Sequence, residues 1–123
     1  EMGSPLFRRV ITFKKLIRQS ELPNIKIITN TCEQKYLNAD KRLINIDPGY
    51  LNQAKLVLTT TKDYAHRIYL GKGIYAEVTL FYRKGKFCDL STTYPDYRTP
   101  EYKKIFLSIR EIYRQQVKNE VKG

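Results

Sequence analysis

The chain has 123 residues, about the length of one domain, which is enough for a modest hydrophobic core without disulfides or metal ions. Its formal net charge of +11, from 23 Lys and Arg against 12 Asp and Glu, favours nucleic acids and phosphorylated small molecules as partners. No apolar run approaches the roughly 20 residues that cross a bilayer, so we expect a cytoplasmic protein with no membrane partner.

The sequence gives no indication of a cofactor. Cys32 and Cys88 lie far apart, and neither has a metal-ligand spacing to His66, the only histidine. We therefore expect no metal and no cofactor, and both cysteines are predicted to be small apolar core residues. The basic residues are spread along the whole chain, so a nucleic-acid footprint would require them to gather in space. No oligomeric state is indicated.

The chain is predicted to be one domain over residues 1–123, because it has no internal repeat, low-complexity tract or linker. It begins at Glu1 instead of a methionine, so we expect a fragment of a longer protein. Residues 7–13 are rich in β-branched and aromatic side chains and predict a strand. Apolar residues at steps of three and four after Pro23 predict an amphipathic helix that ends near Asn38.

Two strands and a turn are expected next along the chain. Residues 42–46 predict a short strand. Residues 47–50 (Asp-Pro-Gly-Tyr) suit a type II turn, which requires the glycine at positive φ. Residues 55–61 combine Leu, Val and Thr and favour a strand, although the apolar spacing around them also permits a short helix.

The second half predicts a sheet followed by a helix. Residues 66–70, 74–82 and 87–90 are separated by glycine-containing turns and predict a three-stranded antiparallel meander. Thr99 as N-cap, Pro100 at the first helical position and an apolar stripe predict a final helix of about five turns. The fold class is therefore α+β: a mostly antiparallel sheet with a three-stranded meander, packed by a long C-terminal helix and a second amphipathic helix.

The first hairpin of the meander sets the predicted faces of the sheet. A three-residue loop would pair Leu70 with Ile74, since hairpin register follows loop length. Alternation then places His66 on the core side with the apolar residues and leaves Arg67 and Glu77 on a polar face. The Arg67–Glu77 pair is interpreted as an exposed cross-strand ion pair, worth well under about 1 kcal/mol.

His66 is the candidate general base, and Asp63 or Glu77 is the carboxylate that would orient it. The predicted catalytic residues are therefore His66, Asp63 and Glu77. A lone histidine on an apolar face is more often a hydrogen-bonded structural residue, and no serine or cysteine nucleophile stands out by spacing. Both interpretations stay open.

Phosphate-binding signals in the sequence are weak. The Gly71-Lys72-Gly73 loop could present amides and an ammonium to a phosphate, but a hairpin turn explains it more simply. The chain has no P-loop, and in residues 61–64 (Thr-Lys-Asp-Tyr) the aspartate comes one position too early for the guanine-reading motif of GTPases. Ten tyrosines interleaved with Lys and Arg could stack on bases, but tyrosine also suits half-buried sheet positions.

Three runs of residues resemble a known family. They are residues 45–51 (Asn-Ile-Asp-Pro-Gly-Tyr-Leu), residues 61–80 (TKDYAHRIYLGKGIYAEVTL) and residues 93–98 (Thr-Tyr-Pro-Asp-Tyr-Arg). The chain resembles, over essentially its whole length, the uncharacterised prokaryotic family called domain of unknown function 4416. The resemblance implies that relatives extend further at the N-terminus. Some relatives carry the label GTP-binding protein, for which this sequence has no motif, and the resemblance names no reaction.

Polar residues in and near these runs form the predicted binding set. We expect turns at Asp47, Asp63 and Asp96 to converge at one end of the sheet and form a pocket for an anionic ligand. The candidate ligand-binding residues are Asp47, Tyr50, Lys55, Lys62, Arg67, Lys72, Tyr94, Asp96, Tyr97 and Arg98.

Three functional hypotheses follow from the sequence. The first is a binding module for a nucleic acid or for a phosphorylated or nucleotide ligand. The second is a small-molecule enzyme that uses His66 with Asp63 or Glu77 for acid/base chemistry. The third is an interaction module whose sheet is completed by residues preceding this chain. The sequence does not decide whether the chain is an enzyme.

Overall fold

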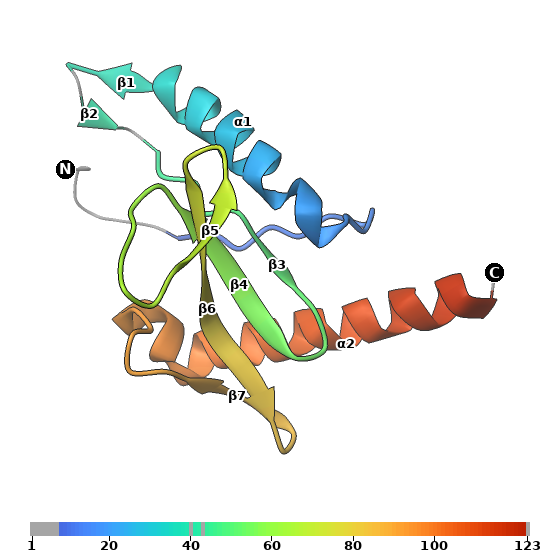
Figure 1. Ribbon diagram of the computed structural model, residues 1–123. Coiled ribbons are helices and arrows are strands. Elements are labelled where there is room, and N and C mark those ends of the chain that lie inside the picture. The colour runs from blue at the N-terminus through green and yellow to red at the C-terminus, as the bar shows by residue number, and fades with distance from the viewer. Residues whose placement is uncertain (1–7, 40, 43, 123) are drawn as a thin grey trace.

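The computed structural model describes residues 8–39, 41–42 and 44–122, which form an antiparallel sheet packed by helices (Figure 1). The helices are η1 (Gln19–Glu21), α1 (Leu22–Gln34), η2 (Pro95–Arg98) and α2 (Pro100–Lys122). The strands are β1 (Leu37–Asn38), β2 (Lys41–Arg42), β3 (Gly49–Leu51), β4 (Lys55–Thr60), β5 (Ile68–Gly71), β6 (Ile74–Arg83) and β7 (Lys86–Asp89). The α+β prediction, with its long C-terminal helix, is confirmed. Within the described ranges, no helix is both long and apolar enough to cross a membrane.

The main sheet has a fork at one edge of β6. Its strand order is β3-β4-β6-β5, with β7 also paired to β6, and all pairs are antiparallel. Because β4 occupies one edge of β6 over residues 75–81, both β5 and β7 must pair with the other edge. β5 covers residues 74–76 and β7 covers residues 80–83. Residues 77–79 are left between them without a strand partner on that edge among the described residues.

Two Lys-Gly turns build the meander. Lys72 and Gly73 have φ of 56° and 77°, and Lys84 and Gly85 have φ of 50° and 87°. Positive φ at both central residues is the geometry of a tight two-residue hairpin turn, in which glycine is favoured. Gly71, instead of Leu70, therefore pairs with Ile74, so the predicted three-residue loop is wrong by one residue.

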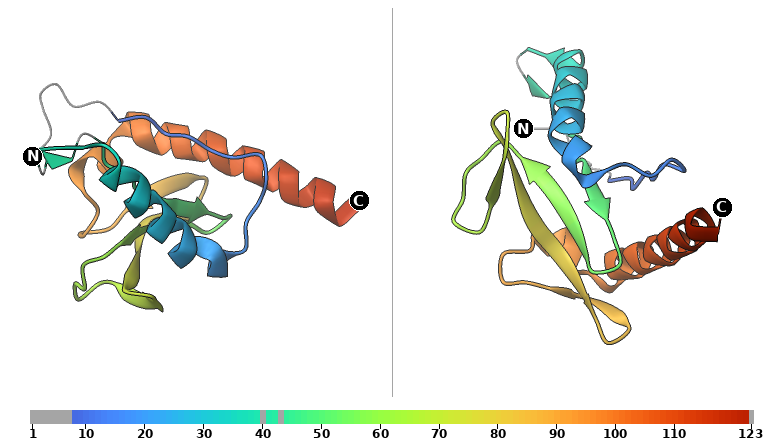
Figure 2. Two further views of the ribbon diagram at one scale, coloured as in Figure 1. Left: turned by 90° about the horizontal axis from the view of Figure 1, so that it is seen from above. Right: turned by 45° about the vertical axis from the view of Figure 1, so that its right-hand side comes forward.

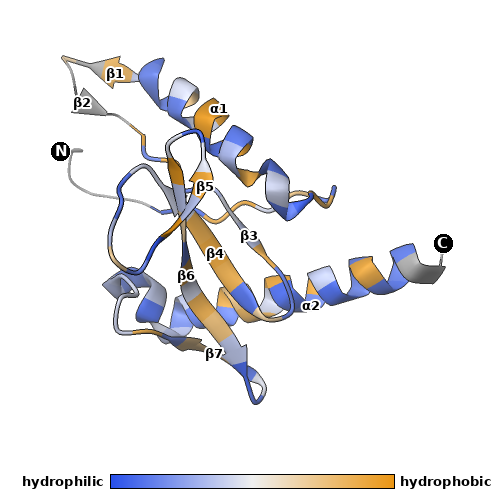
Figure 3. Ribbon diagram, in the orientation of Figure 1, coloured by the Kyte–Doolittle hydropathy of each residue, from blue (hydrophilic) through white to orange (hydrophobic). Residues whose placement is uncertain are grey.

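The largest buried cluster lies between the sheet and α2. Leu56 of β4 pairs with Leu80 of β6, and both pack against Phe106 of α2 in a cluster that includes Phe87 and Tyr97. Figure 2 shows α2, coloured orange to red, on the side of the sheet opposite to the yellow-green β5 hairpin. In Figure 3 the hydrophobic colouring is concentrated along β4 and β6. The core is therefore on the α2 face of the sheet.

The predicted N-cap of α2 is confirmed, because the Thr99 hydroxyl accepts a hydrogen bond from the Tyr102 amide at 3.2 Å. The helix runs about one turn beyond the predicted end. Ile105 and Ile112, which helical spacing places on the predicted apolar stripe, are exposed. The packed face is therefore narrower than the sequence spacing indicates.

The strand, turn and core predictions in the first half are partly wrong. The described part of residues 7–13 is irregular, with Phe13 80% exposed, and Phe7 lies outside the described residues. Of residues 42–46, only Arg42 is in a strand; Leu43 lies outside the described residues and residues 44–46 are irregular. Cys32 is exposed and Cys88 is half-buried, so neither is a core residue.

Helix α1 buries a polar face against a loop, which explains its irregular apolar pattern. The Glu33 carboxylate accepts a hydrogen bond from the Ile46 amide at 2.6 Å, and the Lys26 ammonium donates to the Ile46 carbonyl at 3.4 Å. Both charged side chains are buried, whereas Ile28 is exposed. The helix ends at Gln34, earlier than Asn38, because β1 begins at Leu37.

Gly49 is required by close packing and not by a turn. It begins β3 opposite Leu58 and does not adopt positive φ, so the type II turn is wrong. A Cβ atom there would lie 2.1 Å from the Val57 carbonyl oxygen and 2.7 Å from Leu58 Cδ2. Glycine therefore allows β3 to approach β4.

Gly49→Ala is expected to lower the free energy of unfolding by about 1–3 kcal/mol, because the methyl group must push β3 away from the Val57 backbone. Urea denaturation followed by circular dichroism measures this change. Gly85→Ala is the control, since a Cβ there meets nothing within 4 Å and only the positive φ is strained, at about 1 kcal/mol. A Gly49→Ala variant as stable as the native chain would contradict the packing argument.

Candidate functional site

A hollow of about 460 Å³ lies on the sheet face opposite to α2, beside the fork in β6. Tyr50, Val57 and Val78 lie side by side on β3, β4 and β6, because they are paired in register across the sheet. Ile68 of β5 pairs with Ala76 of β6 on the same face. These apolar side chains form the floor, and loop residues form the walls. The full lining is Tyr50, Lys55, Val57, His66, Ile68, Leu70, Ala76, Glu77, Val78, Leu90 and Thr92.

At β5 the sheet face that carries the hollow is more exposed to solvent than the opposite face. The sequence predicted the reverse, with the hollow face in the core. Ile68 and Leu70 are 69% and 38% exposed, whereas Arg67 and Glu77, predicted to be on the exposed polar side, are buried. The reason is that Tyr64 and Tyr94 both contact the Arg67 guanidinium from the other side of the sheet. His66 is accordingly not a core residue, and its side chain remains 30% exposed at the edge of the hollow.

His66 contacts one of the two carboxylates proposed for it. Its Nε2 atom lies 2.6 Å from Glu77 Oε2, a short hydrogen-bonding distance, whereas no contact joins it to Asp63 in the described part of the chain. Asp63 is exposed in the loop that precedes β5. A carboxylate bonded to one ring nitrogen fixes the orientation of the imidazole and leaves the other nitrogen for a ligand or substrate. Glu77 can therefore act as the orienting group.

Arg67 fills the fork from the α2 side of the sheet. Its guanidinium lies 3.4 Å from Glu77 Oε1 and donates to the Tyr94 hydroxyl at 3.3 Å and to the Lys62 carbonyl at 3.2 Å. The ring of Tyr64 covers it at 4.2 Å from the centroid. With 2% of the side chain exposed, Arg67 is a buried partner of Glu77 and not a free anion ligand, and the exposed-pair interpretation is wrong.

Lys55 and Tyr50 bring polar groups to the hollow from β4 and β3. Lys55 precedes Val57 by two residues, so both side chains lie on the hollow face. Its ammonium group has no ion-pair or hydrogen-bond partner within the described part of the chain, so it is available to a ligand. Burial raises the pKa of the Tyr50 hydroxyl above its ordinary value, because the ionised phenolate is less well solvated there.

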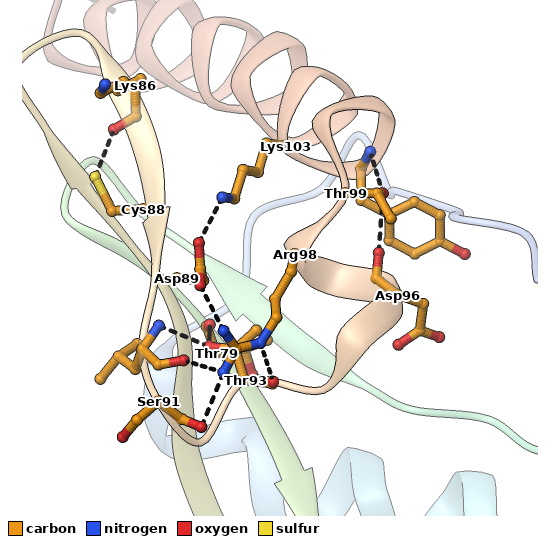
Figure 4. Close-up of polar contacts among 12 residues, drawn as sticks. Thr79, Lys86, Cys88, Asp89, Ser91, Thr93, Asp96, Arg98, Thr99 and Lys103 are labelled. Atoms are coloured by element: carbon orange, nitrogen blue, oxygen red, sulfur yellow. Dashed lines mark hydrogen bonds and ion pairs between the residues drawn. The ribbon is translucent and has the colours of Figure 1, made fainter.

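Arg98, another predicted ligand, is committed to a loop (Figure 4). Its guanidinium donates to the Asp89 carboxylate at 2.9 Å and to the carbonyls of Thr93, Leu90 and Ser91 at 2.7–2.8 Å. Four acceptors on one side chain hold residues 89–93 against the start of α2. Arg98 therefore shapes the wall of the hollow without entering it.

Two of the three turns that were expected to converge, those at Asp47 and Asp96, do lie close together. Arg8 binds both carboxylates there. Arg8 lies 2.9 Å from both carboxylates and donates to the Tyr97 hydroxyl at 3.1 Å. Burial, followed by the neighbouring carboxylates of Asp47 and Asp96, raises the pKa of Tyr97 to about 12 although Arg8 opposes the shift. The cluster ties three segments together. Asp63 is not part of it.

The remaining predicted ligands are dispersed. Lys72 bonds Asn24 of α1, and the Gly73 amide donates to the Tyr69 hydroxyl at 3.1 Å, so this loop is a hairpin turn with its polar groups engaged. Lys62 is exposed in the loop before β5. The Tyr94 hydroxyl accepts a hydrogen bond from Arg67. Of the predicted set, the structure gathers Tyr50, Lys55, His66 and Glu77 around one hollow.

Sequence reasoning missed the loop after β7. Leu90 and Thr92 line the hollow, and Thr93 caps the fork, because its hydroxyl donates to the Thr79 carbonyl at 2.6 Å. Thr79 is the extra residue of a β-bulge against β4. Three consecutive hydroxyl residues after β7, Ser91-Thr92-Thr93, are the signal in the sequence that could have indicated a loop bonded to an open strand edge.

Residues 1–113 match the family described as Domain of unknown function (DUF4416). The chain belongs to this family. The match covers the whole hollow, the fork and most of α2. No curated protein and no solved structure matches the chain.

The Arg67–Glu77 pair is expected to be strongly coupled, because each charge is buried against the other. Glu77→Gln should lower the free energy of unfolding by about 3–5 kcal/mol, since it leaves a buried guanidinium without its carboxylate. In a double-mutant cycle with Arg67→Met, measured by urea denaturation, the double variant should lose at least about 1 kcal/mol less than the sum of the single changes. Additive losses would contradict a direct interaction.

Proposed function

We propose that the chain binds a small phosphorylated molecule with an apolar or aromatic body, such as a nucleotide, in the hollow beside the fork. The observation that carries this proposal is an apolar floor beside the accessible edge of His66 and the Lys55 ammonium, which has no partner among the residues that the structure describes. Small-molecule sites typically have a mainly apolar lining and a few polar groups that fix orientation. The volume of about 460 Å³ falls in the range of such sites.

The distribution of cations supports a small ligand in this hollow over a polymer. Arg67 is buried and Arg98 donates to four acceptors of the protein, so the cation expected to meet the ligand is Lys55. One lysine suits one acidic group, whereas a polyanion requires a row of cations. The net charge of +11 raises the local concentration of any anion near the surface.

A second candidate function is acid/base catalysis on the bound molecule. The 2.6 Å contact between His66 Nε2 and Glu77 Oε2 favours it, because a carboxylate-oriented imidazole is a common general base. The phosphate monoester p-nitrophenyl phosphate is the probe for this activity. His66→Gln should abolish its hydrolysis while the far-UV spectrum is unchanged, and hydrolysis that survives the change would remove the catalytic role.

AMP binding tests the main proposal. AMP should raise the melting temperature of the chain, measured by differential scanning fluorimetry, because a ligand that binds only the folded state stabilises it. Adenosine and inorganic phosphate should each give a smaller shift, since each supplies half of the interaction. Lys55→Met should weaken AMP binding by about tenfold, the loss of one charge-assisted contact.

Lys118→Met is the matched control, because Lys118 is exposed on α2 and the change removes the same charge. The control should bind AMP as the native chain does. Equal weakening in both variants would show that net charge alone attracts AMP, and no stabilisation by AMP, adenosine or phosphate would contradict the proposal.

A further inference from the structure

A second hollow, of about 430 Å³, lies between β7 and the first half of α2, separate from the one at the fork. Its lining comes from only two elements, whose backbones are held together by the core around Phe87 and Phe106. The lining residues are Lys86, Phe87, Cys88, Asp89, Lys103, Lys104 and Leu107. We call it the β7–α2 groove.

The groove gathers positive charge that is scattered in the sequence. Lys86, Lys103 and Lys104 line it, and Arg83 and Lys84 stand at the adjacent tip of the β6–β7 hairpin. In Figure 3 this tip is coloured as one of the hydrophilic ends of the sheet. Three lysines thus line one groove beside a basic hairpin tip, and spatial clustering of cations is what a nucleic-acid footprint requires.

Among the described lining residues the groove has one carboxylate, that of Asp89, and it already binds two cations of the protein. Asp89 lies 2.5 Å from Lys103 and 2.9 Å from Arg98, as Figure 4 shows. The hydrogen bond from Lys103 lowers the pKa of Asp89 below its ordinary value. The ammonium groups of Lys86 and Lys104, by contrast, have no hydrogen bond or ion pair within the described part of the chain. Their charge is therefore available to an external anion.

We propose that the β7–α2 groove binds the phosphodiester backbone of a nucleic acid. Lysine ammonium groups are point charges that meet phosphates without requiring one geometry. The aromatic side chain in the groove, Phe87, is 3% exposed and cannot stack on a base. The groove therefore contacts phosphates and not bases. Binding should then be independent of the nucleotide sequence and depend steeply on salt concentration.

The inference stands apart from the small-molecule proposal, because the two hollows share no lining residue. Lys55 and His66 belong to one, and Lys86 and Lys104 to the other. A nucleotide in the fork hollow and a polymer in the groove can therefore be tested on the same chain with different variants.

Fluorescence anisotropy tests the inference, with labelled oligomers of uridine and of thymidine, each about 20 nucleotides long, between about 50 and 200 mM KCl. The native chain should bind both, with a linear fall of log K against log salt. Lys86→Met with Lys104→Met should reduce the salt slope by about two, because each lysine that meets a phosphate contributes about one unit.

The matched control is Lys35→Met with Lys118→Met, two exposed lysines outside the groove, which lowers the net charge equally. It should keep the native slope. The same loss in both double variants, or no binding to either oligomer, overturns the inference. Binding to phosphatidylserine vesicles but not to the oligomers overturns it in favour of a membrane surface. AMP stabilisation should persist in the groove variant, and oligomer binding should persist in Lys55→Met, so either proposal can fail alone.

Discussion

The sharing of one edge of β6 by two hairpin partners is the constraint on which the rest of the structure depends. β5 and β7 cannot both continue along that edge, so residues 77–79 open into a fork. Buried backbone N–H and C=O groups that lack a neighbouring strand must form hydrogen bonds with other groups. The Thr93 hydroxyl binds the Thr79 carbonyl, and the Glu77 side chain is held by His66 and Arg67. The same opening produces the hollow, so the polar network and the candidate site have one origin.

Arginines and lysines have different roles in this basic chain. Arg8 and Arg67 each bind acceptors from separate segments, and Arg98 binds four acceptors within residues 89–93. These arginines thereby hold the loops around the sheet. Their planar, multi-donor guanidinium groups suit this use. In the two hollows the charge available to a ligand comes instead from lysines: Lys55 in the fork hollow, and Lys86 and Lys104 in the groove. Net charge therefore overstates the number of cations that a ligand can meet.

Local signals in the sequence predicted the elements well where they carry strong turn or cap chemistry. The Thr99-Pro100 start of α2 and the Lys-Gly turns of the meander were recognisable because few residues tolerate those positions. The buried state of Arg67 and Glu77 was not predictable, since it depends on a loop that folds back over the strand edge. Nor was the role of Gly49, because its contact with Val57 arises only when β3 meets β4. Within the candidate site, Glu77 was named as one of two possible partners of His66, although the predicted register placed the two residues on opposite faces. The contribution of Leu90 and Thr92 was not predicted.

Methyl-resolved NMR of the chain titrated with AMP tests the central claim most directly, because the two faces of the sheet carry different methyl groups. The account predicts saturable shifts at Val57, Ile68, Leu70 and Val78, which line the hollow, and little change at Leu56 and Leu80 beneath α2. Shifts confined to Leu107 in the β7–α2 groove, or no saturable shift at the four hollow residues, would contradict the claim that the fork in β6 forms a ligand site.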